Sequence, residues 1–169
     1  DVESFVNMYK VLSSKEEKFK YFELVKGDDI AKWYNCENYN SRSGSLGGSC
    51  MSRVNTYYFD IYTKNPDKVN MLILYSDENR NKIKGRSLVW KLDEPSDRTY
   101  MDRIYVNDFS DEVLFIEYAK SNNWLFRSIQ SYQSYGQIAD PLTKTNSNLK
   151  LKVYVDAKHY EYYPYLDTF

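Results

Sequence analysis

Histidine and cysteine, which build most catalytic and metal centres, are scarce in this sequence. The 169 residues include one histidine, His159, and two cysteines, Cys36 and Cys50. Zinc sites need several Cys and His ligands, and Ser–His–Asp or Cys–His catalysis needs an imidazole beside the nucleophile. The composition therefore excludes a zinc site built from Cys and His clusters and weighs against nucleophilic catalysis. A Cys36–Cys50 disulfide is compatible with the count, but we expect two free thiols in a cytosolic protein.

Charge of one sign and long apolar runs are also lacking. The formal net charge is −1, so no overall basic field attracts nucleic acid or an acidic membrane. Apolar runs such as residues 71–75 are far shorter than the roughly 20 residues that span a bilayer. No signal peptide is visible, and the chain begins at Asp1 rather than Met, so we expect a fragment or a processed chain. These features predict a cytoplasmic protein with no membrane partner.

Tyrosine, in contrast, is abundant, with 18 residues. Its flat apolar face and polar tip make it common at protein interfaces and at sites where nucleic-acid bases stack. The structural alternative is that many of these tyrosines half-fill a core. For any single tyrosine we favour this structural interpretation.

Hydrophobic periodicity predicts alternating helices and strands. Strands are predicted at residues 19–25, 71–75, 83–92, 100–106, 124–128 and 149–155. Helices are predicted at residues 2–12, 30–35, 55–64 and 110–122. Asp1 and Ser110 are the expected N-caps of the first and last helices. The stretch SSKEEK is expected to be a polar connector, and residues 131–148 an irregular loop.

This order predicts a single α/β (α+β) domain with a mainly antiparallel central sheet and helices on both faces. We divide the chain into an N-terminal helix and connector (1–18), the α/β domain (19–155) and an aromatic C-terminal segment (156–169). That last segment, around YYPYLDTF, is expected to pack on the domain or on a missing neighbour. Trp33, Trp90 and Trp124 are expected to lie in or beside the core.

The stretch SGSLGGSC, residues 43–50, holds three of the six glycines. It lacks the lysine and the glycine spacing of a phosphate-binding P-loop, and the second glycine of a nucleophile elbow. Two interpretations stay open: a flexible joint before a helix, and a small anion nest that uses Ser49 and Arg53. Cys50 is a candidate nucleophile whose thiolate Arg53 would favour, or else a small buried residue.

The charged pair Asp102–Arg103 lies inside the expected strand YMDRIYV. Strict alternation places the two side chains on opposite faces, and Arg86 of the neighbouring strand is expected to pair with Asp102. In the functional interpretation, Asp102 or Tyr105 acts in a charged cleft, with Arg86 or Arg103 holding an anion and Tyr100 lining it. In the structural interpretation, these residues form an ion-pair network around the sheet.

The order strand, two helices, three antiparallel strands, helix, strand resembles the Gcn5-related N-acetyltransferase fold. In that family the central strand splays from its neighbour, and the next helix N-terminus holds the pyrophosphate of acetyl-CoA. The resemblance implies an acyl-CoA-dependent N-acyltransferase, with the helix from Ser110 at the cofactor. At the position of the family's glycine motif, however, this chain has VNDFSDE, which contains no glycine.

The stretches GSLGGSCMSR, KIKGRSLVW, YMDRIYV and YYPYLDTF resemble serial motifs of uncharacterised tailed-bacteriophage proteins. This resemblance implies phage origin and a place in the host cytoplasm, and it carries no activity.

Our first functional hypothesis is a non-catalytic binding module that acts through its tyrosine-rich surface on a host or phage macromolecule, with a protein as the favoured partner, and needs no cofactor. The alternatives are an acyltransferase-like enzyme that uses acetyl-CoA and a protein that binds nucleotides or single-stranded nucleic acid. In the enzyme hypothesis Asp102 or Tyr105 lies near the chemistry, and in the nucleic-acid hypothesis tyrosines stack on bases while arginines bind phosphate.

Overall fold

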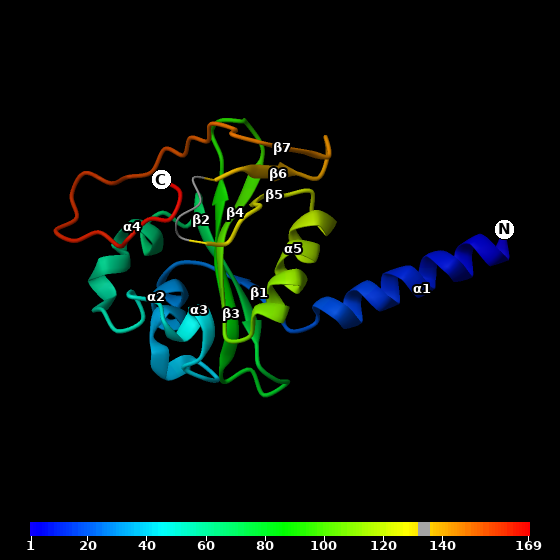
Figure 1. The fold of residues 1–169 in the computed structure, drawn as a ribbon, viewed down its shortest axis with the longest axis horizontal. Helices are drawn as coiled ribbons and strands as arrows, with labels where there is room; N and C mark the ends of the chain where they lie inside the picture. Colours follow the sequence, from blue (N-terminus) through cyan, green and yellow to red (C-terminus); the bar gives the residue numbers. More distant parts are fainter. Residues whose placement is uncertain (132–135) are drawn as a thin grey trace.

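A computed structural model describes residues 1–131 and 136–169 and shows an α+β fold around one seven-stranded sheet (Figure 1). The strands are β1 (Phe22–Val25), β2 (Val69–Tyr75), β3 (Ile83–Lys91), β4 (Thr99–Val106), β5 (Leu125–Arg127), β6 (Ile138–Asp140) and β7 (Thr145–Ser147). They lie side by side in chain order, and β4 and β5 form the one parallel pair among them. The expected mainly antiparallel sheet is confirmed.

Helices cover both faces of the sheet, as expected (Figure 1). One face carries α2 (Asp28–Tyr34), α3 (Gly44–Gly47), α4 (Asp60–Thr63) and the 3-10 turns Cys36–Asn38 and Thr56–Phe59. The other carries α5 (Glu112–Ser121), which follows the 3-10 turn Phe109–Asp111. Successive β2 residues divide between the two cores: Met71 and Ile73 pack under the first group of helices, and Leu72 packs towards α5. Because both of its faces are covered, β2 is a nearly continuous apolar run.

Helix α1 (Val2–Phe19) begins as predicted, with the Asp1 carboxylate accepting a hydrogen bond from the Glu3 amide at 2.8 Å. It continues through SSKEEK, so the predicted connector is wrong. No proline or glycine interrupts this stretch, and its side chains pair with neighbours: Lys20 bonds Glu17, and Lys18 forms an ion pair with Glu117 of α5. None of its residues is buried, and the helix extends away from the sheet (Figure 1).

The C-terminal third differs most from expectation. Residues 149–155 alternate like a strand but form only one bridge, between Lys152 and Glu94, because no neighbouring strand is placed to pair with them. The predicted strand is therefore wrong. Conversely, the predicted irregular loop contains the hairpin of β6 and β7, although residues 132–135 of that loop lie outside the described residues.

Smaller differences concern helix ends. The predicted helix 55–64 divides into a 3-10 turn and α4, and the predicted helix 110–122 begins with a 3-10 turn. Asp108 caps that turn by accepting from the Ser110 amide, so Ser110 is not the N-cap. The division of the chain into the parts 1–18, 19–155 and 156–169 stays a prediction.

Candidate functional site

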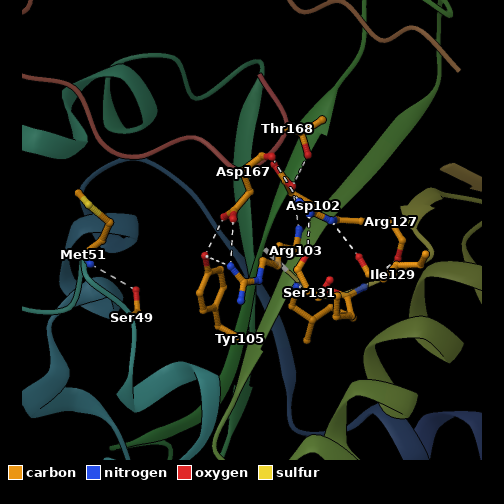
Figure 2. A network of polar contacts seen from close by, with 12 residues as sticks. Ser49, Met51, Asp102, Arg103, Tyr105, Arg127, Ile129, Ser131, Asp167 and Thr168 are labelled. Carbon is orange, nitrogen blue, oxygen red and sulfur yellow. Dashed lines mark hydrogen bonds and ion pairs between the residues drawn. The ribbon is translucent and has the colours of Figure 1, made fainter. Parts of the chain in front are cut away.

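A β-bulge in β4 determines how the candidate residues lie. Ser87 of β3 pairs with Ile104 and Val89 pairs with Met101, so Asp102 and Arg103 both lie opposite the single residue between them. Such a bulge interrupts alternation and redirects a side chain. Asp102 and Arg103 therefore contact neighbours on the same face, and the prediction that they face opposite sides is wrong (Figure 2).

Asp102 is a buried hydrogen-bond acceptor, only 3% exposed. Its Oδ2 accepts from the indole Nε1–H of Trp90 at 3.1 Å. Its Oδ1 accepts from the backbone N–H of Arg103 at 2.8 Å and from the hydroxyl of Thr168 at 2.6 Å. Burial raises the pKa of the Asp102 carboxyl, and the bond from Thr168 acts in the opposite direction. Two of the three donors belong to the sheet, and the third, Thr168, belongs to the C-terminal segment.

Arg86 is also buried, at 2% exposed, but its partners are aromatic. The guanidinium carbon lies 4.1 Å from the ring centroid of Tyr34 and 4.5 Å from that of Tyr105. Nη2 donates to the Ser49 hydroxyl at 3.0 Å, and Nε donates to the Tyr39 hydroxyl at 3.4 Å. Desolvated contacts of this kind between a guanidinium and a ring stabilise by about 2 kcal/mol or more.

The expected ion pair between Arg86 and Asp102 is wrong. The register places Arg86 opposite Tyr105 rather than opposite Asp102. No carboxylate lies within ion-pair distance of Arg86 in the part of the chain that the structure describes. Burial acts to lower the pKa of the Arg86 guanidinium, but the neighbouring tyrosines raise it overall, so Arg86 is a permanent cation in the core.

Tyr105 lies between this cation and the C-terminal segment. The Arg103 guanidinium carbon lies 4.8 Å from the centroid of the same ring. The Tyr105 hydroxyl donates to Asp167 Oδ2 at 2.8 Å, and Arg103 Nη1 lies 3.4 Å from Asp167 Oδ1 (Figure 2). Burial raises the pKa of Tyr105, so its hydroxyl keeps the proton that it donates.

Residues 167–169 complete the cluster. The Thr168 hydroxyl donates to Asp102, so the Tyr100 hydroxyl, 2.9 Å from it, is the donor in that second contact. The ring of Phe169 meets the ring of Trp90 edge-on, with centroids 4.9 Å apart. The backbone carbonyl of Asp167 accepts from the buried Arg127 side chain of β5 at 3.3 Å. The sheet face and the C-terminal segment therefore form one site.

The Gly/Ser stretch packs on the end of β4. Its turn is α3, and the Ser45 hydroxyl bonds both the carbonyl and the amide of Val106. Gly44 has φ +66°, and a Cβ there would lie 2.3 Å from the Asn107 carbonyl oxygen. The glycines thus permit close backbone approach. The amides of residues 47–49 donate within the turn, which leaves them no free donor for an anion.

The predicted site residues separate into two groups. Ser49 joins the cluster through Arg86, together with the sheet residues Tyr100, Asp102, Arg103 and Tyr105. Cys50 and Arg53 are exposed and take no part in it, and Cys50 is a free cysteine rather than a small buried residue.

Sequence reasoning missed six members of the cluster: Tyr34, Tyr39, Arg127, Asp167, Thr168 and Phe169. It placed Trp90 in the core but gave it no hydrogen-bonding role. The available signal was the aromatic stretch that includes YYPYLDTF, which indicates packing because so many aromatic side chains favour burial.

No protein-family model, curated protein or solved structure matches this chain. In residues 1–131 and 136–169, no helix is both long and apolar enough to cross a bilayer. The same residues contain no group of three or more His, Cys, Asp or Glu side chains that is placed to hold a metal ion.

Proposed function

We propose that this protein is a non-catalytic interaction module that binds a helix of another protein through α1. The observation that carries the proposal is an unpartnered apolar arc on an 18-residue helix without a buried residue. At 100° per residue, the arc spans roughly 160°. It consists of Val2, Phe5, Val6, Met8, Tyr9 and Leu12, all exposed.

The spacing of the arc indicates a helical partner. Val2, Phe5, Tyr9 and Leu12 follow one another at intervals of three, four and three residues. This is the spacing of a seam along which two helices pack knobs into holes. A partner of matching chemistry is an amphipathic helix with a similar apolar stripe.

Charge beside the seam disfavours a second copy of this chain as the partner. Lys15 and Lys20 occupy positions that face each other in a parallel pair of identical helices, and Glu16 on the seam faces its own copy. Like charges placed in this way repel. The favoured partner therefore carries acidic residues beside its apolar stripe, where Lys15 and Lys20 meet them.

The energetic contribution of the arc is moderate. Fully burying one such side chain stabilises by about 1.5–3 kcal/mol, so six that are partly exposed supply roughly 5–10 kcal/mol. Association itself costs about 4–15 kcal/mol. Each apolar side chain therefore has a measurable share in the affinity.

The test combines crosslinking with a matched pair of substitutions. A photoreactive residue in place of Tyr9 captures the partner, which is then purified for a titration. We expect Phe5→Ser to weaken its Kd about tenfold or more. Val11→Ser is the control, because Val11 is as exposed as Phe5 but lies off the arc. Equal effects of the two substitutions, or crosslinking only to a second copy, would contradict the proposal.

A second candidate function, acyl transfer from coenzyme A, is favoured by one feature of the sheet. The parallel strands β4 and β5 pair only at Tyr100 with Leu125 and at Met101 with Phe126, after which β4 continues towards α5. This resembles the splayed strand pair of the N-acetyltransferases. Against it, Gln130 Oε1 accepts from the Ile104 amide at 2.7 Å beyond the divergence.

The turn before α5 is also acidic, which further weakens the coenzyme A proposal. Asp108 has its pKa lowered by the backbone hydrogen bond from Ser110, so a negative charge stands where a pyrophosphate would bind. A melting scan with acetyl-CoA separates the two functions. A rise of several degrees supports acyl transfer, since a ligand that binds only the native state stabilises it. An unchanged melting temperature argues against acyl transfer and favours the interaction module.

A further inference from the structure

The C-terminal segment, residues 156–169, is attached to the domain mainly by its side chains. It crosses the sheet face that carries α2 and α4 without forming a helix or strand (Figure 1). Within the described ranges, no backbone–backbone hydrogen bond involves any residue of this segment. Segments held in this way open more readily than strands in a ladder.

Three consecutive side chains of this segment contact neighbouring parts of one receptor surface on the sheet, which consists of Trp90, Tyr100, Asp102, Arg103 and Tyr105. The Asp167 carboxylate is bound by Arg103 and by the Tyr105 hydroxyl. The Thr168 hydroxyl lies between the Asp102 carboxylate and the Tyr100 hydroxyl. The Phe169 ring lies against the rings of Trp90 and Tyr100, with centroids 4.9 and 6.3 Å away. The receptor surface thus recognises an acid, a hydroxyl and an aromatic ring in succession.

The sheet residues that contact the segment are more deeply buried than residues 168 and 169, which lie over them. These sheet residues come from the central strands β3 and β4, and Trp90, Tyr100 and Asp102 are at most 3% exposed. Phe169, in contrast, remains 39% exposed, and Thr168 is an exposed residue. The site is thus built into the sheet, and the segment lies over it.

The cleft also extends beyond the segment. A cavity of about 550 Å³ adjoins it, and its lining includes Tyr100, Thr168, Phe169, Ile138 and Leu151. Part of this cleft is therefore not filled by residues 167–169. A longer peptide has room for further contacts there.

We propose that this cleft is a peptide-binding site and that residues 167–169 are its intramolecular occupant. The external ligand is an extended protein segment that carries an acidic residue, then a threonine or serine, then an aromatic residue. It binds by displacing residues 167–169 from β3 and β4. This site is separate from α1, so it stands or falls independently of the helix-binding proposal.

Tethering determines how strongly the segment competes. A short flexible tether gives an effective concentration of about millimolar, so a peptide of similar intrinsic affinity is largely excluded from the intact chain. Removing the three side chains abolishes this competition. We therefore expect the substituted chain to bind an external peptide at least about tenfold more tightly than the intact chain.

The experiment titrates a synthetic peptide with the sequence of residues 165–169, YLDTF, into the 169-residue chain and into a variant of it. The variant carries Asp167→Ala, Thr168→Ala and Phe169→Ala, and the control peptide is the scramble FTLYD. The readout is the indole N–H resonance of Trp90, because that proton is donated to Asp102 inside the receptor. We expect YLDTF, but not the scramble, to shift this resonance in the variant. A folded variant whose Trp90 resonance is unmoved by millimolar YLDTF would overturn the proposal.

A second measurement tests the proposal even if the triple variant does not fold. Hydrogen exchange of the Trp90 indole in the intact chain reports release of the segment without any substitution. We expect it to exchange faster than the backbone amides of β2 and β3, which open only with the whole domain. Exchange at the same rate as those amides would show that the segment is part of the core, and the proposal would fail.

Discussion

Replacing Asp102 by alanine tests whether this carboxyl organises the sheet and the C-terminal segment. The substitution leaves the Trp90 indole N–H and the Arg103 amide without their acceptor. Each unsatisfied buried donor costs about 1–3 kcal/mol, whereas the hydroxyl of the exposed Thr168 is able to turn towards water. Losing a buried carboxyl offsets part of this cost. We therefore expect the free energy of unfolding to fall by about 3 kcal/mol, or roughly 6–12 °C in melting temperature.

The loss of stability caused by Asp102→Ala should depend on pH in a defined direction, which distinguishes it from the loss caused by an ordinary core substitution. Because burial raises the pKa of Asp102, the native state binds its proton more readily than the unfolded chain does. The stability that this carboxyl contributes is therefore complete below its unfolded pKa, about 3.9. That stability is lost as the pH rises through the raised native value. The difference between the intact chain and Asp102→Ala should thus grow when the pH falls from 7 towards 4.

Urea unfolding followed by tryptophan fluorescence at several pH values measures this difference. The pH dependence that the other carboxyls contribute cancels in this difference, because the intact chain and the variant both contain them. The control is Asp156→Ala, which removes an exposed aspartate whose side chain makes no hydrogen bond or ion pair in the described structure, and should change stability by less than about 0.5 kcal/mol. The reasoning is refuted if Asp102→Ala costs less than about 1 kcal/mol at pH 7, or if its cost shrinks in acid.

Three further predictions concern the sheet and its ion pairs. Gly85→Ala should lower the unfolding free energy by about 1–3 kcal/mol, because the added Cβ would lie 2.7 Å from the buried Phe115 ring. Chemical unfolding measures this loss, and Gly136→Ala is the control because its nearest neighbouring atom lies 4.0 Å from the added Cβ. Arg86→Lys should cost about 1–3 kcal/mol in melting experiments through lost stacking on Tyr34 and Tyr105, and the exposed Arg53→Lys should be neutral. The hydrogen bond from Arg98 lowers the pKa of Asp140 to about 2. The stability that Asp140 contributes is therefore present above about pH 4 and is lost as the pH falls through about 2. In acid titrations of the unfolding free energy, Asp140→Asn should lose less stability over this pH range than the intact chain does.

The central strands were predictable because their cause is local. β2 is an apolar run between turn residues, and β3 has the apolar stretch 88–90 near its end, so burial of these parts follows from the local sequence. The faces of β4 were not predictable beyond Met101, because the bulge at Asp102 and Arg103 depends on how β3 and β4 align. Alternation holds only in a regular ladder. A single extra residue therefore reverses the predicted sheet face of every later residue relative to the residues before the bulge.

The C-terminal errors have a different cause. Residues 149–155 alternate well enough for a strand, but a strand requires a neighbour, and these residues bridge Glu94 only at Lys152. The β6–β7 hairpin pairs a very short strand around the buried Ile138 with the polar strand Thr145–Ser147, and it forms because β5 offers β6 an open edge. In both segments the arrangement in space outweighs the local pattern, and single-sequence reasoning has no access to that arrangement.

The candidate site shows why the tyrosine content was ambiguous. Tyr34 and Tyr100 are buried, as the structural interpretation expects, yet each also makes a specific contact: one holds the Arg86 guanidinium and the other donates to Thr168. A ring with a polar tip both fills a core and ends in a hydrogen bond. The same property lets this face surround a cation without a carboxylate and still present donors to Asp167 and Thr168. Burial of a tyrosine is therefore no argument against a binding role for the surface that its hydroxyl reaches.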